Sequence, residues 1–212
     1  MNLRKTLVLT GVFLGVFAFA NPKAQAEDFS ITFTAGPNLA NIGGDDASDD
    51  ADMRLGLNAG GLANYALSDQ FAVQGGLQFS SKGTTQEIEM FDPDDPTQTV
   101  EADIEQALSY LDVPLLAAFH PVEGVSLFGG LQPSILVDAE FTTENGDEET
   151  EDISDAITDV DFAIALGAGY THESGFGLRA GYDLGLSSTD DVGDDDVFNR
   201  VIKISLAYDL SL

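Results

Sequence analysis

The chain has no cysteine, two histidines and eight basic residues among its 212. Without cysteine no disulfide can form, so an exported form of the chain must rely on its secondary structure alone. Past its first 26 residues the chain has no apolar run close to the roughly twenty residues that a membrane-spanning helix needs. If this chain lies in a membrane, strands must cross it, because only helices and closed barrels satisfy every backbone polar group there.

The eight basic residues stand against 37 acidic ones, which gives a formal net charge of −29. Such a chain repels nucleic acid and anionic surfaces, so no nucleic-acid partner is expected. Acid at this level is also typical of disordered chains. Here, however, the acid is concentrated between strongly patterned apolar segments, which predicts a folded domain with acidic connections.

The N-terminus is typical of a secretory signal peptide. Arg4 and Lys5 precede an apolar stretch over residues 7–20, and Ala24-Gln-Ala26 is a small-x-small cleavage site. The apolar stretch, about fourteen residues, is too short for a bilayer-spanning helix. We therefore expect residues 1–26 to be a cleaved signal peptide and residues 27–212 to form one outer-membrane β-barrel domain. That domain has five basic residues and a formal charge of −32.

The last eleven residues, 202–212, alternate apolar and polar side chains without interruption. Ile204 and Leu206 fall on one face of such a strand, and Lys203 and Ser205 fall on the other. A terminal strand that is apolar on one face and small or charged on the other is typical of outer-membrane barrels. The alternation recurs in seven earlier segments, which begin near residues 29, 55, 71, 111, 125, 160 and 176. The sequence therefore predicts an all-β fold, an eight-stranded antiparallel up-and-down transmembrane β-barrel.

The connections between these segments alternate in length. Three are brief, at residues 68–69, 120–124 and 172–175, and four are long, at residues 40–52, 82–105, 140–158 and 187–198. The long connections hold 26 of the 37 carboxylates. In outer-membrane barrels the periplasmic turns are short and the external loops are long. We therefore predict four long acidic external loops, an outer-membrane location and both termini in the periplasm.

A soluble lipocalin-type barrel also has eight strands, but it buries its apolar face inside. Its exterior would carry many Lys, Glu and Arg, whereas the polar faces here carry mainly Gly, Ala, Ser and Gln. We therefore expect the apolar faces to contact lipid. Aromatic residues also gather beside the brief connections, as an interfacial girdle would: Tyr65, Phe71, Phe119, Tyr170 and Phe176. Pro114 and Pro133 interrupt predicted strands, so each is expected to mark a bulge or a ladder break.

Three segments carry a family resemblance: YLDVPLL at residues 110–116, DFAIALGAGY at 161–170 and RAGYDLGLS at 179–187. In these segments the chain resembles the PorT-like outer-membrane β-barrel proteins of the Bacteroidetes lineage, and the resemblance covers essentially all of residues 27–212. It implies an eight-stranded outer-membrane barrel and makes Pro114 a family feature. It implies no single function, although the founding member of the family belongs to a protein-secretion system.

The two histidines, His120 and His172, fall in separate brief connections, and no motif pairs either one with a nucleophile. We therefore expect no enzyme activity, no catalytic residue and no cofactor. The acidic loops do supply oxygen ligands of the kind that Ca²⁺ or Mg²⁺ prefers, without the spacing of an EF-hand. Weak divalent binding and a merely solvated acidic surface both stay open. The candidate ligands are Asp45, Asp46, Asp92, Asp94, Asp95, Asp194, Asp195 and Asp196.

By strand parity, six charged side chains point into the lumen: Asp112, Asp161, Arg179, Asp183, Lys203 and Asp209. An eight-stranded barrel leaves an interior just wide enough for side chains to fill. These charges could line a path for small solutes or could pair and plug the lumen. We favour the plug, because buried charges are costly unless paired. With Arg179 and Lys203 as the only bases on predicted inward positions, we expect Arg179 to pair with Asp112 or Asp183.

The sequence therefore predicts a small monomeric outer-membrane barrel that contacts lipid, is inserted by the barrel-assembly machinery and has a structural or surface-interaction role. The alternatives are a component of a protein-secretion or envelope-assembly complex, and a narrow solute channel. The charge of −32 also predicts a halophilic source. At molar salt the Debye length falls to about 3 Å, which screens the repulsion among carboxylates.

Overall fold

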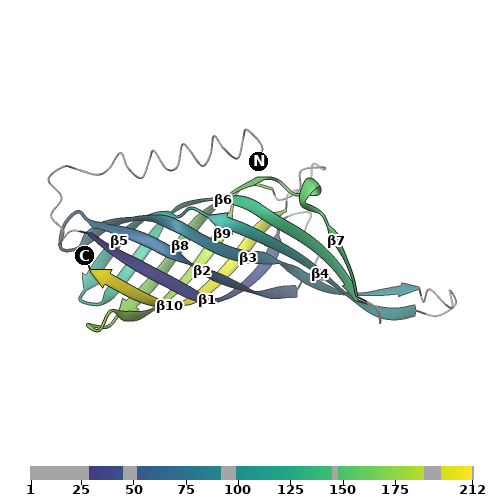
Figure 1. The fold of residues 1–212 in the computed structure, drawn as a ribbon, viewed down its shortest axis with the longest axis horizontal. Coiled ribbons are helices and arrows are strands. Elements are labelled where there is room, and N and C mark those ends of the chain that lie inside the picture. Colours follow the sequence, from purple (N-terminus) through teal and green to yellow (C-terminus); the bar gives the residue numbers. More distant parts are fainter. Residues whose placement is uncertain (1–28, 45–51, 92–98, 145–147, 189–196, 212) are drawn as a thin grey trace.

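The computed structural model describes residues 29–44, 52–91, 99–144, 148–188 and 197–211. Their strands form one antiparallel sheet that closes on itself as a barrel (Figure 1). The elements are β1 (Phe29–Gly43), β2 (Asp52–Ala66), β3 (Phe71–Phe91), β4 (Thr99–Asp112), β5 (Leu115–Val122), β6 (Val125–Glu144), β7 (Glu148–Asp152), the 3-10 helix η2 (Ser154–Ala156), β8 (Val160–Thr171), β9 (Phe176–Gly185) and β10 (Phe198–Ser211). No described segment is a helix with the length and apolar character needed to span a membrane.

The barrel ring has eight strand positions. β1 pairs with both β2 and β10, and this second pairing closes the ring. β4 and β5 together occupy one of these positions, since each pairs with β3 on one side and with β6 on the other. The remaining neighbours around the ring are β6, β8, β9 and β10. β7 is an addition that pairs with β6 outside the ring. The predicted eight-stranded antiparallel barrel is confirmed.

The two strand prolines lie on neighbouring strands, beside the same interruption of the sheet. Val113 and Pro114 separate β4 from β5. There Val113 N donates to Pro133 O at 2.8 Å, and Gly76 N donates to Pro114 O at 3.3 Å. Pro133 lies within the continuous strand β6, and the nearest register shift comes further on, beside Val137. The N–H and C=O of one strand residue point to the same side, so the N–H that Pro133 lacks would face the interruption. The pairing of β6 with β4 ends at Ser134 and its pairing with β5 begins at Leu131, so Pro133 lies at a ladder break, as predicted, although β6 continues through it.

The outer face of the ring is apolar. Leu206 is 71 % exposed, Leu55 69 % and Phe176 66 %, whereas the neighbouring Ser205 is 5 % exposed. An apolar surface of this extent around a whole barrel would promote aggregation in water and is satisfied by lipid. The predicted parity of the strands is confirmed, and it excludes the lipocalin-type arrangement.

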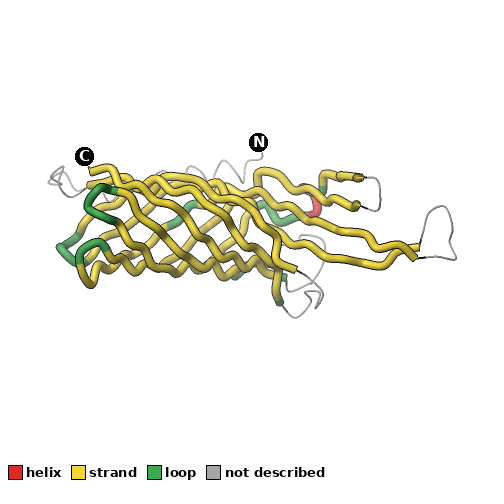
Figure 2. Tube along the Cα trace, turned by 90° about the horizontal axis from the view of Figure 1, so that it is seen from below, coloured by secondary structure: helices red, strands yellow, loops and turns green. Residues whose placement is uncertain are grey.

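The two ends of the barrel differ. The three brief connections, at residues 67–70, 123–124 and 172–175, lie at one end together with Ser30 and Ser211, which are partners in the sheet. We call this the turn end and the opposite one the loop end. In Figures 1 and 2 the β3–β4 hairpin and the β6–β7 hairpin extend far beyond the rest of the ring at the loop end.

Two predicted loops are mostly strand. β3 continues to Phe91 and β4 begins at Thr99, within the connection predicted at 82–105, while β6 and β7 fill much of 140–158. The pairing of β3 with β2 ends at Thr85, so the strands beyond it form a separate four-stranded extension. We call this extension the protruding sheet; it comprises residues 86–91, 99–105, 138–144 and 148–152. Its acidic residues obscured the strand alternation, which charge does not abolish when one face is solvated.

The chain after β7 returns to the inner side of the barrel wall. Ile153 and Ile157 pack against a buried cluster on β4 and β6, formed by Leu108, Tyr110, Leu136 and Ala139. Backbone bonds fix this segment, with Ile153 N donating to Ala139 O at 2.9 Å and Leu136 N donating to Asp159 O at 2.9 Å. Residues 153–157 therefore narrow the lumen at the loop end.

Candidate functional site in the barrel interior

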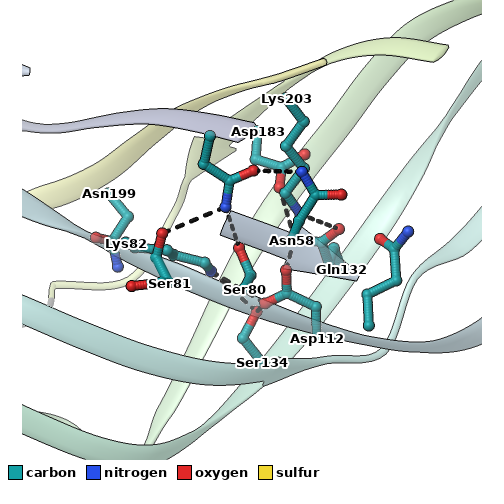
Figure 3. Close-up of polar contacts among 12 residues, drawn as sticks. Asn58, Ser80, Ser81, Lys82, Asp112, Gln132, Ser134, Asp183, Asn199 and Lys203 are labelled. Carbon is teal, nitrogen blue, oxygen red and sulfur yellow. Dashed lines mark hydrogen bonds and ion pairs between the residues drawn. The ribbon is translucent and has the colours of Figure 1, made fainter. Parts of the chain in front are cut away.

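Five charged side chains from five strands meet in the loop-end half of the lumen. Figure 3 labels four of them, Lys82, Asp112, Asp183 and Lys203. They are Lys82 of β3, Asp112 of β4, Asp161 of β8, Asp183 of β9 and Lys203 of β10. All five are buried, and the most accessible, Lys203, is 8 % exposed. We call this group the charge network.

Asp112 joins the two lysines of the charge network. Its Oδ2 lies 2.8 Å from Lys203 Nζ, and its Oδ1 lies 3.2 Å from Lys82 Nζ. Lys203 Nζ also lies 2.7 Å from Asp183 Oδ2, and Lys82 Nζ lies 3.6 Å from Asp161 Oδ2. Each ammonium therefore contacts two carboxylates, and no carboxylate of the network lacks a cation.

Neutral side chains also donate hydrogen bonds to the three carboxylates, and Figure 3 labels several of these donors. Ser134 Oγ donates to Asp112 Oδ1 at 2.7 Å, and Gln132 Nε2 donates to Asp183 Oδ2 at 2.8 Å. Asp161 accepts from Asn199 Nδ2 at 3.0 Å and from Ser187 Oγ at 2.8 Å. Three carboxylates against two ammoniums leave one excess negative charge, which these donors help to stabilise.

The structure brings together four of the six predicted lumen residues, Asp112, Asp161, Asp183 and Lys203, and adds Lys82. Lys82 falls within the external loop predicted at residues 82–105, so the predicted number of inward-facing bases is wrong. The signal was available, because Lys82 continues the inward parity of Gln78 and Ser80 along β3. The ring of Tyr110 also faces Lys82, with Nζ 4.4 Å from the ring centroid.

Arg179 and Asp209 lie apart from the charge network, nearer the turn end. Arg179 stacks on Phe128, with Cζ 4.0 Å from the ring centroid, and its Nη2 donates to Gln74 Oε1 at 3.1 Å. Within the described residues Arg179 has no ion pair, so its predicted pairing with Asp112 or Asp183 is wrong. Asp183 lies four residues further along β9, about 13 Å of strand, and Lys82 supplies the second cation of Asp112 instead.

The turn-end half of the lumen holds a cavity of about 670 Å³. Polar side chains line it, among them Thr32, Gln74, Arg179 and Asp209. The Asp209 carboxylate accepts hydrogen bonds from the Thr32 hydroxyl and, at 2.9 Å, from the Thr171 hydroxyl. A void of about 40 Å³ lies between Arg179 and the charge network. We call the larger space the turn-end cavity.

The histidines lie at the rim of the turn-end cavity. His120 belongs to β5, which continues to Val122, so its predicted place in a turn is wrong by three residues. His172 is exposed, with Nδ1 3.0 Å from Ser174 Oγ and 3.2 Å from Ser174 N. Both contacts lie within one exposed turn, which they cap.

The eight candidate metal ligands, Asp45, Asp46, Asp92, Asp94, Asp95, Asp194, Asp195 and Asp196, lie outside the described residues. Within the described ranges, no three His, Asp or Glu side chains are grouped so that they could hold a metal ion.

An apolar exterior, a closed antiparallel ring and a polar interior define a small outer-membrane β-barrel protein. Residues 19–191 match the model of the outer membrane protein beta-barrel domain family, and the chain belongs to this family. It is therefore an outer-membrane protein in contact with lipid.

Solved structures similar to this chain include three small barrels. The attachment invasion locus protein Ail of Yersinia pestis is 18 % identical, with 86 % of this chain and 99 % of Ail covered and a TM-score of 0.49. Neisserial surface protein A is 11 % identical, with 87 % and 97 % covered and a TM-score of 0.45. The N-terminal barrel of Pseudomonas aeruginosa OprF is 14 % identical, with 85 % and 97 % covered and a TM-score of 0.38. No curated protein matches the chain in sequence.

Proposed function

We propose that this outer-membrane protein has a surface-interaction role and that the protruding sheet is the surface that it presents to cationic partners. The observation that carries the proposal is a row of carboxylates directly opposite one another across neighbouring strands. Glu87 pairs with Asp103, and Asp103 pairs with Glu144. Like charges in such positions repel, so a cationic partner or divalent cation that binds there relieves a built-in repulsion.

The composition of the protruding sheet supports the same proposal. It contains no Lys or Arg. Its exposed carboxylates are Glu87, Glu89, Glu101, Asp103, Asp138, Glu140, Glu144, Glu149, Glu151 and Asp152. An extended surface of one sign steers oppositely charged molecules toward it.

The direct test compares two variants of equal charge in lipid vesicles, with a fluorescent oligolysine peptide as the probe. One variant replaces Glu87, Glu89, Glu101 and Asp103 with the corresponding amides. The control replaces Asp190, Asp191, Asp194 and Asp195, which lie outside the described residues, in the same way. We expect the first variant to bind the peptide at least fivefold more weakly than the control. Equal weakening in both would mean that net charge, and not the protruding sheet, governs binding.

The role requires a particular orientation. We propose that residues 1–26 are cleaved as a signal peptide, that both termini lie in the periplasm and that the loop end faces the exterior, after insertion by the barrel-assembly machinery. The short turns at one end and the long extensions at the other support this orientation. Protease added to intact cells should cut near residues 92–95 and spare residues 172–175. Cleavage only at residues 172–175 would reverse the proposed topology.

A solute channel is disfavoured by the interior. The charge network spans the lumen from five strands, and residues 153–157 narrow it further at the loop end. We expect no stepwise conductance in planar bilayers and no enzyme activity. A role in a secretion or envelope-assembly complex, as the PorT-like resemblance suggests, is compatible with a protruding interaction surface, and we place it second.

A further inference from the structure

The turn-end cavity contains a half-buried cation, Arg179, whose hydrogen-bonding capacity is mostly unused by the described residues. A guanidinium has five N–H donors, and one of those of Arg179 is bound, by Gln74 Oε1 at 3.1 Å. No carboxylate of the described residues lies within 4.0 Å of the guanidinium. The nearby Asp209 uses both oxygens for the hydroxyls of Thr32 and Thr171. An unpaired charge in such a setting is costly, and a bound anionic group would offset that cost.

Packing contacts hold the guanidinium of Arg179 in place. The guanidinium rests on the ring of Phe128, which is itself seated over Gly167: a Cβ at that glycine would lie 2.4 Å from the ring. This platform fixes the plane of the guanidinium at the floor of the cavity. A fixed guanidinium plane favours the paired hydrogen bonds that a carboxylate accepts.

The opposite charge lies at the mouth of the same cavity. Glu123 and Glu173 line the rim and are both exposed. Arg179 is four residues into β9 from Gly175, about 13 Å along a strand. With a strand tilt near 40°, the floor lies roughly 10 Å below the rim. The cavity therefore presents a positive floor and a negative mouth about three extended residues apart.

We propose that the turn-end cavity binds the C-terminal end of a short peptide, with its terminal carboxylate on Arg179 and its ammonium group near the rim. The volume of about 670 Å³ is that of a typical small-molecule site. A free amino acid cannot reach both charges, because one Cα separates its carboxylate and ammonium groups. Phosphate and other multiply charged anions are repelled by Asp209 and by the two rim glutamates. The proposal goes beyond the protruding sheet and is independent of it.

The arginine count of the chain allows a direct observation. The chain has four arginines, Arg4, Arg54, Arg179 and Arg200, so selective ¹⁵N labelling of arginine side chains gives very few signals. The protein refolded in detergent micelles is titrated with trialanine, with trialanine amide, with alanine and with inorganic phosphate. We expect trialanine to shift the Nε–H signal of Arg179 saturably and to leave those of Arg54 and Arg200 unchanged.

The unmodified protein alone can overturn the proposal. We expect the amide, alanine and phosphate each to bind at least tenfold more weakly than trialanine. Equal binding of trialanine and its amide would rule out carboxylate recognition, and equal or tighter binding of phosphate would replace the peptide with a simple anion site. No shift at Arg179 with any of the four probes would leave the cavity without this function.

A matched pair of variants adds a second readout. Arg179→Gln should abolish saturable binding of trialanine, and Arg200→Gln should leave it within twofold of the original, because Arg200 is exposed on the outer face. Unchanged binding in Arg179→Gln, with far-UV circular dichroism showing a folded barrel, would contradict the assignment. The oligolysine test of the protruding sheet uses the other end of the molecule, so failure of either experiment leaves the other intact.

Discussion

The charge network and the protruding sheet place carboxylates in opposite surroundings. In the network, Asp112, Asp161 and Asp183 are under 5 % exposed and each contacts at least one lysine. In the protruding sheet, Glu87 and Asp103 are exposed and stand opposite each other as direct strand partners. Access to water decides which arrangement is tolerated: a buried charge must be paired, whereas repulsion between solvated charges costs only tenths of a kcal/mol to about 1 kcal/mol.

The largest effect should follow from removing a cation from the network. Lys82→Met leaves Asp161 without its lysine and Asp112 with one lysine in place of two. We expect this to lower the free energy of unfolding by about 3–5 kcal/mol. Urea titration of the protein folded into lipid vesicles measures the change. Arg200→Met, which removes a charge from the exposed outer face, is the control, and a loss below 1 kcal/mol for Lys82→Met would refute the pairing.

The next largest effect separates lipid contact from water contact. Leu206→Arg places a cation on the most exposed apolar position of β10 and should cost about 2–4 kcal/mol near the bilayer midplane. Glu87→Arg, on the protruding sheet, should be close to neutral in the same vesicle assay. Ser205→Arg is unsuitable as a control, since Ser205 is buried and its Oγ donates to Asn58 Oδ1 at 2.7 Å. Equal costs for Leu206→Arg and Glu87→Arg would mean that the two regions share one environment.

A smaller effect should follow from breaking one like-charge pair. Glu89 and Glu101 are direct partners on β3 and β4, and Glu101→Lys converts their repulsion into attraction. We expect the protruding sheet to gain about 0.2–1 kcal/mol locally. Slower amide exchange at residues 86–91 would show this gain, and exchange in β8 and β9 should not change. Glu101→Gln is the matched control and should give about half the effect.

The smallest effect concerns salt and bears on the proposed halophilic source. Raising the salt from millimolar to molar shortens the Debye length to about 3 Å, so repulsion within the protruding sheet should fall. Amide exchange there should slow as salt rises, and exchange around the charge network should stay constant because buried pairs are screened much less. A rate in the protruding sheet that is indifferent to salt would remove the physical basis of the halophilic hypothesis.

Much of the fold could be predicted from the sequence because strand parity is a local signal. The alternation of Ile204 and Leu206 with Lys203 and Ser205 identified both faces of β10, and the same rule placed Asp112, Asp161 and Asp183 inward. Parity failed for Lys82 only because the end of β3 was misplaced. Parity could not predict which inward charges pair with each other. The cation that faces Asp112 depends on the stagger between strands distant in sequence, and alternation along one strand contains no information about that stagger.

The protruding sheet has a height that its strand lengths determine. β3 has 21 residues and β6 has 20, whereas about nine to eleven tilted residues cross the apolar core of a membrane. The remaining ten or so residues, at about 3.3 Å each and a tilt near 40°, rise roughly 25 Å beyond that core. The polar headgroup layer occupies only about 5–8 Å of this height on each side. Because the same hydrogen-bonded strands run from the lipid to the tip, they hold the acidic surface clear of the membrane at a fixed distance and angle.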